Sequence, residues 1–286
     1  MFNIERWQEI FEAIAKNKLR TILTGISVAS GIFILVILLG VGKGIQNGIE
    51  KQFERDADGI VEVWSGTTTM EYKGLNPGRQ IQFHNADYDI TVQKLGDQID
   101  RKSSTYSFWN GEIVYGAETG TYQYRGVYPD YQVIENATVT EGRFINANDI
   151  SNSEKVAVIG QKVKLDLFKE KDPIGEQIAV SKINFKVIGV FTDPGGEREE
   201  SRVFLPITTT QQAYGIADKI SNLAFTLVKK DNYEEALKAS NKFTSEIGQL
   251  LRGKNTIAPD DLSALGVNSS IENAKQFYDL NLYKIP

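Results

Sequence analysis

A long uncharged segment near the start of the chain limits the possible folds more than any other feature. No charged residue stands between Arg20 and Lys43, where the sequence reads TILTGISVASGIFILVILLGVG. A helix of these roughly 22 residues is about 33 Å long and can cross a hydrocarbon core of about 30 Å. A buried helix of a globular protein is seldom this long without a charge, and a cleaved signal peptide has a shorter apolar core. We therefore predict an uncleaved transmembrane helix over residues 21–43.

The residues before this segment predict a short amphipathic helix, over residues 1–20, that lies in the membrane interface. Apolar side chains recur there at helical spacing and form one stripe, made of Trp7, Ile10, Phe11 and Ile14. A basic cluster stands directly against the apolar segment and consists of Lys16, Lys18 and Arg20. By the positive-inside rule this end is cytoplasmic, so we expect the long polar remainder outside the cytoplasm.

The end of the uncharged segment looks like an incomplete phosphate loop, GVGKGIQNG. A Walker A loop needs Ser or Thr after its Gly-Lys pair, but Gly44 follows Lys43, and Ile37 occupies the place of the leading glycine. We therefore expect no nucleotide site here. The glycines either permit close packing of helices or are tolerated without a role of their own. Beyond the loop the helical spacing continues and predicts a stalk helix over residues 44–58. Its apolar positions are Ile45, Ile49 and Phe53.

Composition excludes several classes of function. The 286 residues include no cysteine and one histidine, so disulfides, thiol chemistry and histidine-rich metal sites are excluded. The net charge of the chain is −5, which does not favour binding of nucleic acid. No basic patch with interleaved aromatic residues indicates a nucleic-acid partner. A metal site from His84, Asp87 and Asp89 is chemically possible, although a solvated turn fits this segment better. No residue suggests catalysis, and we expect neither an enzyme nor a cofactor of its own.

The polar remainder predicts an α+β fold, because one order of elements occurs twice. A strand, a helix and a strand are predicted at residues 60–66, 86–99 and 106–116, and again at 222–230, 232–253 and 255–261. Two such halves separated by a long insert indicate a split ferredoxin-like, porter-like α/β subdomain. We assign it residues 59–116 and 222–286.

The insert, residues 117–221, predicts a β-rich subdomain. A continuous apolar strand is expected at Lys155–Gly160, and two strands are expected to meet near Ser181–Lys182. Asp172, Pro173 and Gly175 stand at the first, second and fourth positions of a predicted type I turn. The segment from 193 to 201, DPGGEREES, predicts an exposed hairpin loop.

Several of these motifs together resemble the MacB-like permeases of ABC transporters, over about residues 15–230. The resemblance lies first in KNKLRTILTGISVASGIFILVILLGVGKG, which is similar to the first membrane segment of that family. It continues in TEGRFINANDISNSEKVAVIGQKVKLDLFKEKDPIGEQIAVSKINFKVIGVF and in VFLP, which resemble the periplasmic core of the family. We expect structural roles, in a tight turn and in strand register, for Gly142, Arg143, Asp172, Pro173, Gly175 and Pro206.

The resemblance implies a mechanical function in the bacterial inner membrane. A permease subunit of this type couples ATP hydrolysis by a separate cytoplasmic ATPase to motion of its periplasmic domain, for substrate export or lipoprotein release. It further implies a permease homodimer or heterodimer, a periplasmic adaptor protein as a further partner, and ATP bound only on the ATPase subunit. Because members carry three more membrane spans after this domain, we expect the chain to be part of a longer permease. The alternative is a single-pass, membrane-anchored periplasmic binding or scaffold module.

Overall fold

The computed structural model describes the backbone of residues 16–55, 59–231 and 233–275, and their side chains except those of residues 45–55. Most of the interfacial helix predicted over residues 1–20 lies outside the described residues. The chain divides into two compact units, Met1–Arg55 and Asp56–Pro286. The described part of the first unit consists mainly of α2, an unbroken helix of 38 residues from Lys18 to Arg55.

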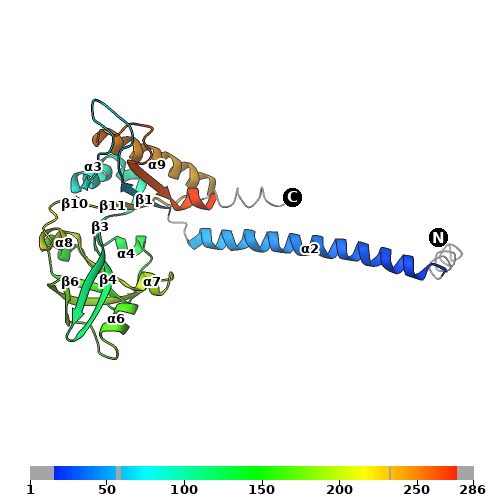
Figure 1. Cartoon of the computed structure of the whole chain (residues 1–286), viewed down its shortest axis with the longest axis horizontal. Coiled ribbons are helices and arrows are strands. Elements are labelled where there is room, and N and C mark those ends of the chain that lie inside the picture. The colour runs from blue at the N-terminus through cyan, green and yellow to red at the C-terminus, as the bar shows by residue number, and fades with distance from the viewer. Residues whose placement is uncertain (1–15, 56–58, 232, 276–286) are drawn as a thin grey trace. The chain divides into compact units, whose positions relative to one another are not determined.

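The second unit is a mixed α and β structure (Figure 1). Its strands are β1 (Ile60–Ser65), β2 (Phe83–His84), β3 (Ile99–Tyr115), β4 (Glu118–Val127), β5 (Thr138–Gly142), β6 (Val156–Gly160), β7 (Gln177–Val180), β8 (Ile183–Thr192), β9 (Arg202–Pro206), β10 (Lys219–Ile220), β11 (Asn222–Leu227) and β12 (Leu265–Ser269). Its labelled helices are α3 (Asn85–Leu95), η1 (Gly96–Gln98), α4 (Tyr131–Ile134), α5 (Ala147–Ser151), α6 (Gln161–Leu167), α7 (Glu197–Glu200), α8 (Ile207–Ala213) and α9 (Tyr233–Lys254). Residues 270–275 are also helical.

The predicted split ferredoxin-like arrangement is confirmed by the strand order. The neighbours along the sheet are β12, β1, β11 and β3, and each of these pairs is antiparallel. The two crossover helices, α3 and α9, pack with one face of these strands into a single hydrophobic cluster. Helix α9 forms because its apolar residues repeat at helical spacing, and Phe243, Ile247 and Leu251 are fully buried as a result.

The sheet continues without interruption from these strands into the β-rich part. Strand β3 pairs with β11 through Thr105 and then with β4, with an irregularity between Phe108 and Gly111. Beyond it the order is β4, β9, β6, β8 and β5, and β7 joins β3 to β8. One continuous sheet of ten strands therefore holds the second unit together, and the predicted division at residues 117 and 221 stays a prediction.

Three hydrophobic clusters make up the core. The first lies between α3, α9 and the ferredoxin-like strands, and the second lies within the β-rich part. The third joins the two, because Ile60 of β1 and Ala224 of β11 pack with Phe191 and Phe204 of the β-rich strands. Burial of this joint cluster stabilises the association of the two parts by removing apolar surface from water.

Two predictions of secondary structure, over residues 255–261 and 193–201, are wrong. Residues 255–261 form turns instead of a strand, because the buried carboxylate of Asp261 accepts hydrogen bonds from the backbone N–H groups of Thr69 (2.7 Å) and Met70 (3.3 Å). The strand of this half is β12, further along the chain. The segment from 193 to 201 is not a plain hairpin loop, since it contains α7, and Glu199 of α7 forms an ion pair with Arg202.

Candidate functional site

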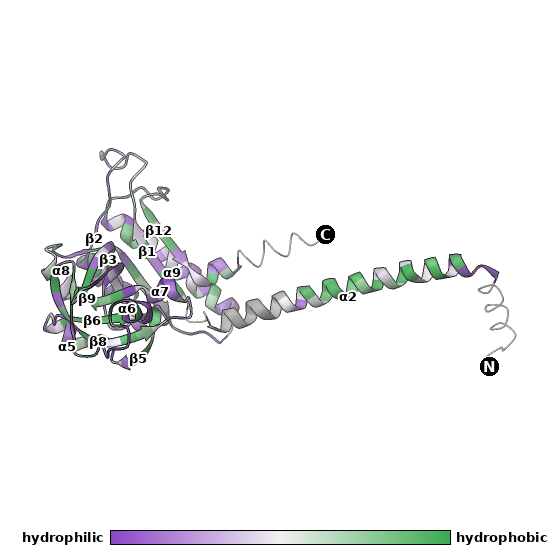
Figure 2. Ribbon diagram, turned by 60° about the horizontal axis from the view of Figure 1, so that its bottom comes forward, coloured by the Kyte–Doolittle hydropathy of each residue, from purple (hydrophilic) through white to green (hydrophobic). Residues whose placement is uncertain are grey.

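The apolar stretch of α2 is the first candidate functional element. It runs from Lys18 to Gly44 and is 27 residues long, and no residue of its most apolar window is buried within the described structure. Figure 2 shows it as a nearly continuous hydrophobic band. The hydroxyl groups of Thr24 and Ser27 donate to backbone carbonyls one turn earlier, at 2.8 and 2.9 Å. Hydroxyl groups bonded in this way have a hydrogen-bond acceptor even inside hydrocarbon. By its length and composition the helix can cross a membrane.

The glycine-rich stretch Gly40–Gly48 is part of this helix and forms no loop. Backbone N–H groups inside a helix donate to carbonyls four residues earlier and therefore cannot converge on a phosphate. A methyl group added at Gly40, Gly42 or Gly44 would meet no atom within 4 Å, so these positions leave open space beside the helix.

The predicted coupling residues Ile45, Ile49 and Phe53 lie in the last turns of α2. Their side chains lie outside the described part of the structure, so their predicted role is not tested. Their backbone is helical, and the helix does not break between the apolar stretch and Arg55. An unbroken helix is a stiff connection between its two ends.

Gly142 and Arg143 join three elements of the β-rich part. Gly142 has φ of +70°, and a side chain there would collide with the carbonyl oxygen of Ile188 on β8. The guanidinium of Arg143 donates to both carboxylate oxygens of Asp149, at 2.6 and 2.9 Å. The same carboxylate accepts a hydrogen bond of 2.8 Å from the backbone N–H of Asn146, and Asn146 is the N-cap residue of α5. Burial favours a higher pKa for Asp149, but these hydrogen bonds together hold it below its usual range.

The turn at Asp172–Gly175 differs from the predicted type I turn. The turn hydrogen bond, of 3.2 Å, joins the carbonyl of Pro173 to the N–H of Glu176, one residue later than expected. Gly175 then occupies the third position with φ of +90°, which is the geometry of a type II turn. The carboxylate of Asp172 accepts from the N–H of Ile174 at 2.9 Å and fixes the turn.

Pro206 ends β9 in a parallel pair with Val127 of β4. It also stands at the N-cap position of α8, and its carbonyl accepts from the hydroxyl of Thr210 at 2.9 Å. Proline suits this boundary because it has no backbone N–H that would need an acceptor, and its fixed φ matches the φ of −60° found here.

A largely buried polar cluster, which we call the Arg125–Arg202 cluster, was not predicted. Glu135 forms ion pairs with Arg125 (3.7 Å) and with Arg202, and all three side chains are less than a fifth exposed. Arg125 also donates to the hydroxyl of Tyr131 at 2.6 Å. Glu62 of β1 faces this cluster, and its pKa is raised, first by burial and then by the charge of Glu135.

The structure gives His84 and its neighbours roles in the fold. The Nδ1 atom of His84 lies 2.9 Å from the carboxylate of Asp218. The buried carboxylate of Asp87 accepts from the N–H of His84 at 2.8 Å and forms an ion pair with Lys254 at 3.0 Å. Within residues 16–55, 59–231 and 233–275, no group of three or more histidine or acidic side chains is placed to hold a metal ion.

The sequence matches the model of the family described as the MacB-like periplasmic core domain, over residues 21–242. It is 27% identical to the macrolide export ATP-binding/permease protein MacB of Chlorobaculum tepidum over 264 residues, which are 91% of this chain and 39% of that protein. It is 30% identical to the MacB protein of Bdellovibrio bacteriovorus over 209 residues, 72% of this chain and 32% of that protein. The chain thus spans less than two fifths of the length of these relatives.

Two solved structures share the fold. The periplasmic region of MacB from Actinobacillus actinomycetemcomitans superimposes with a TM-score of 0.63 at 18% identity, covering 81% of this chain and 98% of that one. The extracellular domain of the noncanonic ABC-type transporter YknZ from Gram-positive bacteria gives a TM-score of 0.58 at 18% identity, covering 73% of this chain and 99% of that one.

Proposed function

Because the chain belongs to the MacB-like family of ABC-transporter permeases, as its periplasmic core domain indicates, we propose that it is a permease subunit acting as a mechanical transmitter. In this proposal a separate cytoplasmic ATPase hydrolyses ATP, and the resulting motion passes through α2 to the domain formed by residues 59–275. That motion expels a substrate or releases a lipoprotein. The names of the relatives point to a macrolide as the first substrate to test.

One observation carries the proposal: α2 is a single helix from the apolar stretch to Arg55. A hinge in this connection would absorb motion, whereas an unbroken helix passes it on as a rigid-body displacement. The glycines and Lys43 do not interrupt it. In this proposal ATP binds to the ATPase subunit and not to the stretch Gly40–Gly48.

Further membrane helices are the expected neighbours of α2. A shallow groove along its first turns exposes small residues, among them Thr21, Gly25 and Ala29. Small residues let helix backbones approach closely in lipid, where packing and interhelical hydrogen bonds drive association. This supports assembly with other spans of a permease homodimer or heterodimer. A periplasmic adaptor protein is a further proposed partner.

The proposed location is the bacterial inner membrane, with residues 1–20 in the cytoplasm. The basic cluster before the apolar stretch supports this orientation. A cysteine introduced at Gly196 is expected to react with a membrane-impermeant thiol reagent in cells with a permeabilised outer membrane, and a cysteine at Asn3 is not. Labelling of the Asn3→Cys variant alone would show that the chain has the opposite orientation in the membrane.

The function itself is tested by assembly with the ABC-type ATPase of the same cell. The permease is expected to copurify with that ATPase and to change its rate of ATP hydrolysis in proteoliposomes, and the complex is expected to export a macrolide. A chain that anchors its domain in the membrane but neither binds the ATPase nor alters its rate would instead be a scaffold module.

A further inference from the structure

An open groove of about 510 Å³ lies on the outer face of the β7–β8 hairpin, in the β-rich part. None of its residues belongs to the Arg125–Arg202 cluster, and all of them lie within residues 140–191, the segment that resembles the periplasmic core of the family. The groove is lined by Lys155, Gln177, Lys182, Ile183, Asn184 and Lys186.

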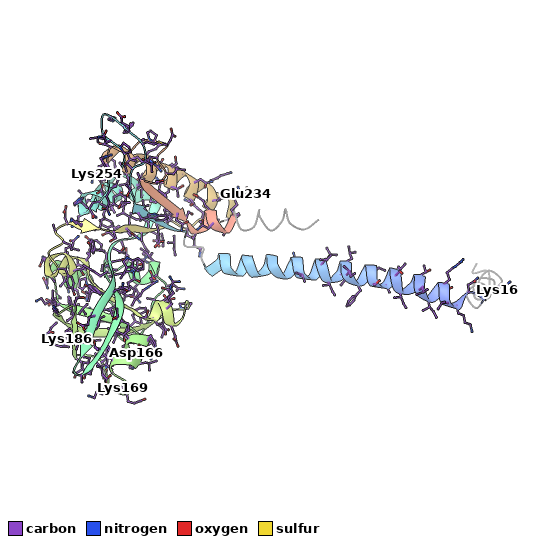
Figure 3. All side chains as sticks on the ribbon, in the orientation of Figure 1. Lys16, Asp166, Lys169, Lys186, Glu234 and Lys254 are labelled. Atoms are coloured by element: carbon purple, nitrogen blue, oxygen red, sulfur yellow. The ribbon has the colours of Figure 1, made fainter. Side chains whose placement is uncertain are left out.

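The sheet directs these polar side chains to one face. Along β8, Phe185 and Val187 are fully buried, so the alternate residues Asn184 and Lys186 are exposed. Figure 3 shows Lys186 at the edge of the β-rich part. Gln177 stands directly opposite Lys186 in the β7–β8 pair. Lys155, the residue directly before β6, also lines the groove, and its backbone carbonyl accepts the N–H of Lys186 at 2.9 Å.

The turn that carries Lys182 is held in place. Ser181 and Lys182 both have positive φ, of 44° and 73°, which is the pattern of a tight type I′ hairpin turn. The N–H of Ser181 donates to the carbonyl of Glu112 at 2.8 Å, and the hydroxyl of Tyr214 donates to the carbonyl of Val180 at 2.8 Å. Lys182 is therefore presented at the groove by a turn anchored to β3 and to the segment after α8.

The charges in the groove are unbalanced. No carboxylate lines it, and within the described residues no hydrogen bond or ion pair engages the amine of any of its three lysines. Other lysines of the same part are paired: Lys164 with Glu141, and Lys162 with Asp166 at 3.0 Å. Three lysines without a counter-charge thus share one open groove, where a bound anion would relieve their mutual repulsion.

We propose that this groove binds a soluble, phosphate-bearing ligand with two or more negative charges. Lysine amines recognise phosphate as point charges, and the amides of Gln177 and Asn184 supply neutral donors beside them. A protein partner needs about 800 Å² of contact with buried apolar anchors, whereas Ile183 is the only apolar residue in the lining. For the same reason the groove offers no surface to the acyl chains of a lipid. The assignment does not depend on the proposed transport function.

The test is calorimetric titration of the full chain in a non-ionic detergent with inorganic pyrophosphate. Saturable binding is expected at low ionic strength, with an affinity that falls as salt is added. The triple variant Lys155→Gln, Lys182→Gln and Lys186→Gln is expected to lose about tenfold or more in affinity, because three attractive charges are removed.

The matched control removes the same charge elsewhere. The variant Lys94→Gln, Lys102→Gln and Lys229→Gln changes three exposed lysines outside the groove and is expected to bind pyrophosphate like the unmodified chain. Thermal unfolding of both variants confirms that they are folded. Equal binding by the two variants, or no saturable binding by the unmodified chain, overturns the proposal. Equal affinity for succinate overturns the assignment to phosphate, and much tighter binding of a short-chain phosphatidic acid overturns the assignment to a soluble ligand.

Discussion

Replacing Ile49 by proline tests whether α2 transmits motion. Position 49 lies inside the helix, six residues before its end at Arg55. Proline there removes one backbone hydrogen bond and clashes with the carbonyl of residue 45, at a local cost of about 3 kcal/mol or more. The helix kinks at that point, because proline is the commonest cause of bends above about 20°.

The size of the disturbance follows from helix geometry. Six residues span about 9 Å, so a bend of about 20° moves the end of α2 by about 3 Å or more. In known conformational switches, helices shift by about 1 to 5 Å. A displacement of about 3 Å lies within that range. The kink therefore both misdirects the helix and creates a flexible point in it.

The assay measures ATP hydrolysis and macrolide export by the same reconstituted complex. Ile49→Pro is expected to leave hydrolysis in place while export falls severalfold. Ile49→Ala is the matched control, since it shortens the same side chain but keeps the helical backbone, and it is expected to export nearly normally. Lys43→Ala is also expected to have little effect. Normal export by Ile49→Pro, or loss of ATP binding in Lys43→Ala, would refute the reasoning.

Three further predictions concern the extracytoplasmic domain. Asp149→Asn loses the bidentate pair with Arg143 and is expected to lower the free energy of unfolding by about 1–2 kcal/mol near pH 7. The pKa of Asp149 is lowered in the folded state, so the stability difference from the unmodified chain shrinks as pH falls through that pKa. Urea unfolding at several pH values measures this difference. Glu62→Gln is expected to raise the thermal midpoint at pH 7, because burial raises the pKa of Glu62 and makes its ionised form unfavourable in the folded state. The gain in midpoint is expected to disappear in acid, and a lower midpoint at pH 7 would contradict the prediction. Gly142→Ala is expected to cost more than Gly74→Ala, by about 1 kcal/mol or more in urea unfolding, because both glycines have positive φ but only the first would strike a backbone oxygen.

Elements with a strong periodic pattern could be predicted from the sequence. The uncharged run predicts α2, and the repeated strand–helix–strand order predicts the ferredoxin-like strands, since α3 and α9 carry apolar residues at helical spacing. Gly142 and Pro206 are the last residues of β5 and β9, and their predicted structural roles stay predictions. The helices and strands themselves are local features, so a single stretch of sequence contains the cause of each.

Features that depend on contacts between distant residues could not be predicted. Strand β3 begins with polar residues, and Ser103, Ser104 and Thr105 are buried in it, so no alternation marks its first half. Strand β12 reads LGVNS, a composition typical of a turn, and it forms because its glycine fits beneath the ring of Trp64. The Arg125–Arg202 cluster depends on the parallel register of β4 and β9, which the sequence of neither strand contains.

The continuity of the sheet decides what can move in the extracytoplasmic domain. Strand β3 belongs to both parts and the third hydrophobic cluster joins them, so separating the parts would break backbone hydrogen bonds and expose buried apolar surface together. Glu62 of β1 and Glu135 also face the same two arginines across the junction. Each of these contacts would have to change if the β-rich part rotated alone. We therefore expect that motion reaching β1 displaces residues 59–275 as one body. If the chain is a mechanical transmitter, we expect it to bend outside this sheet.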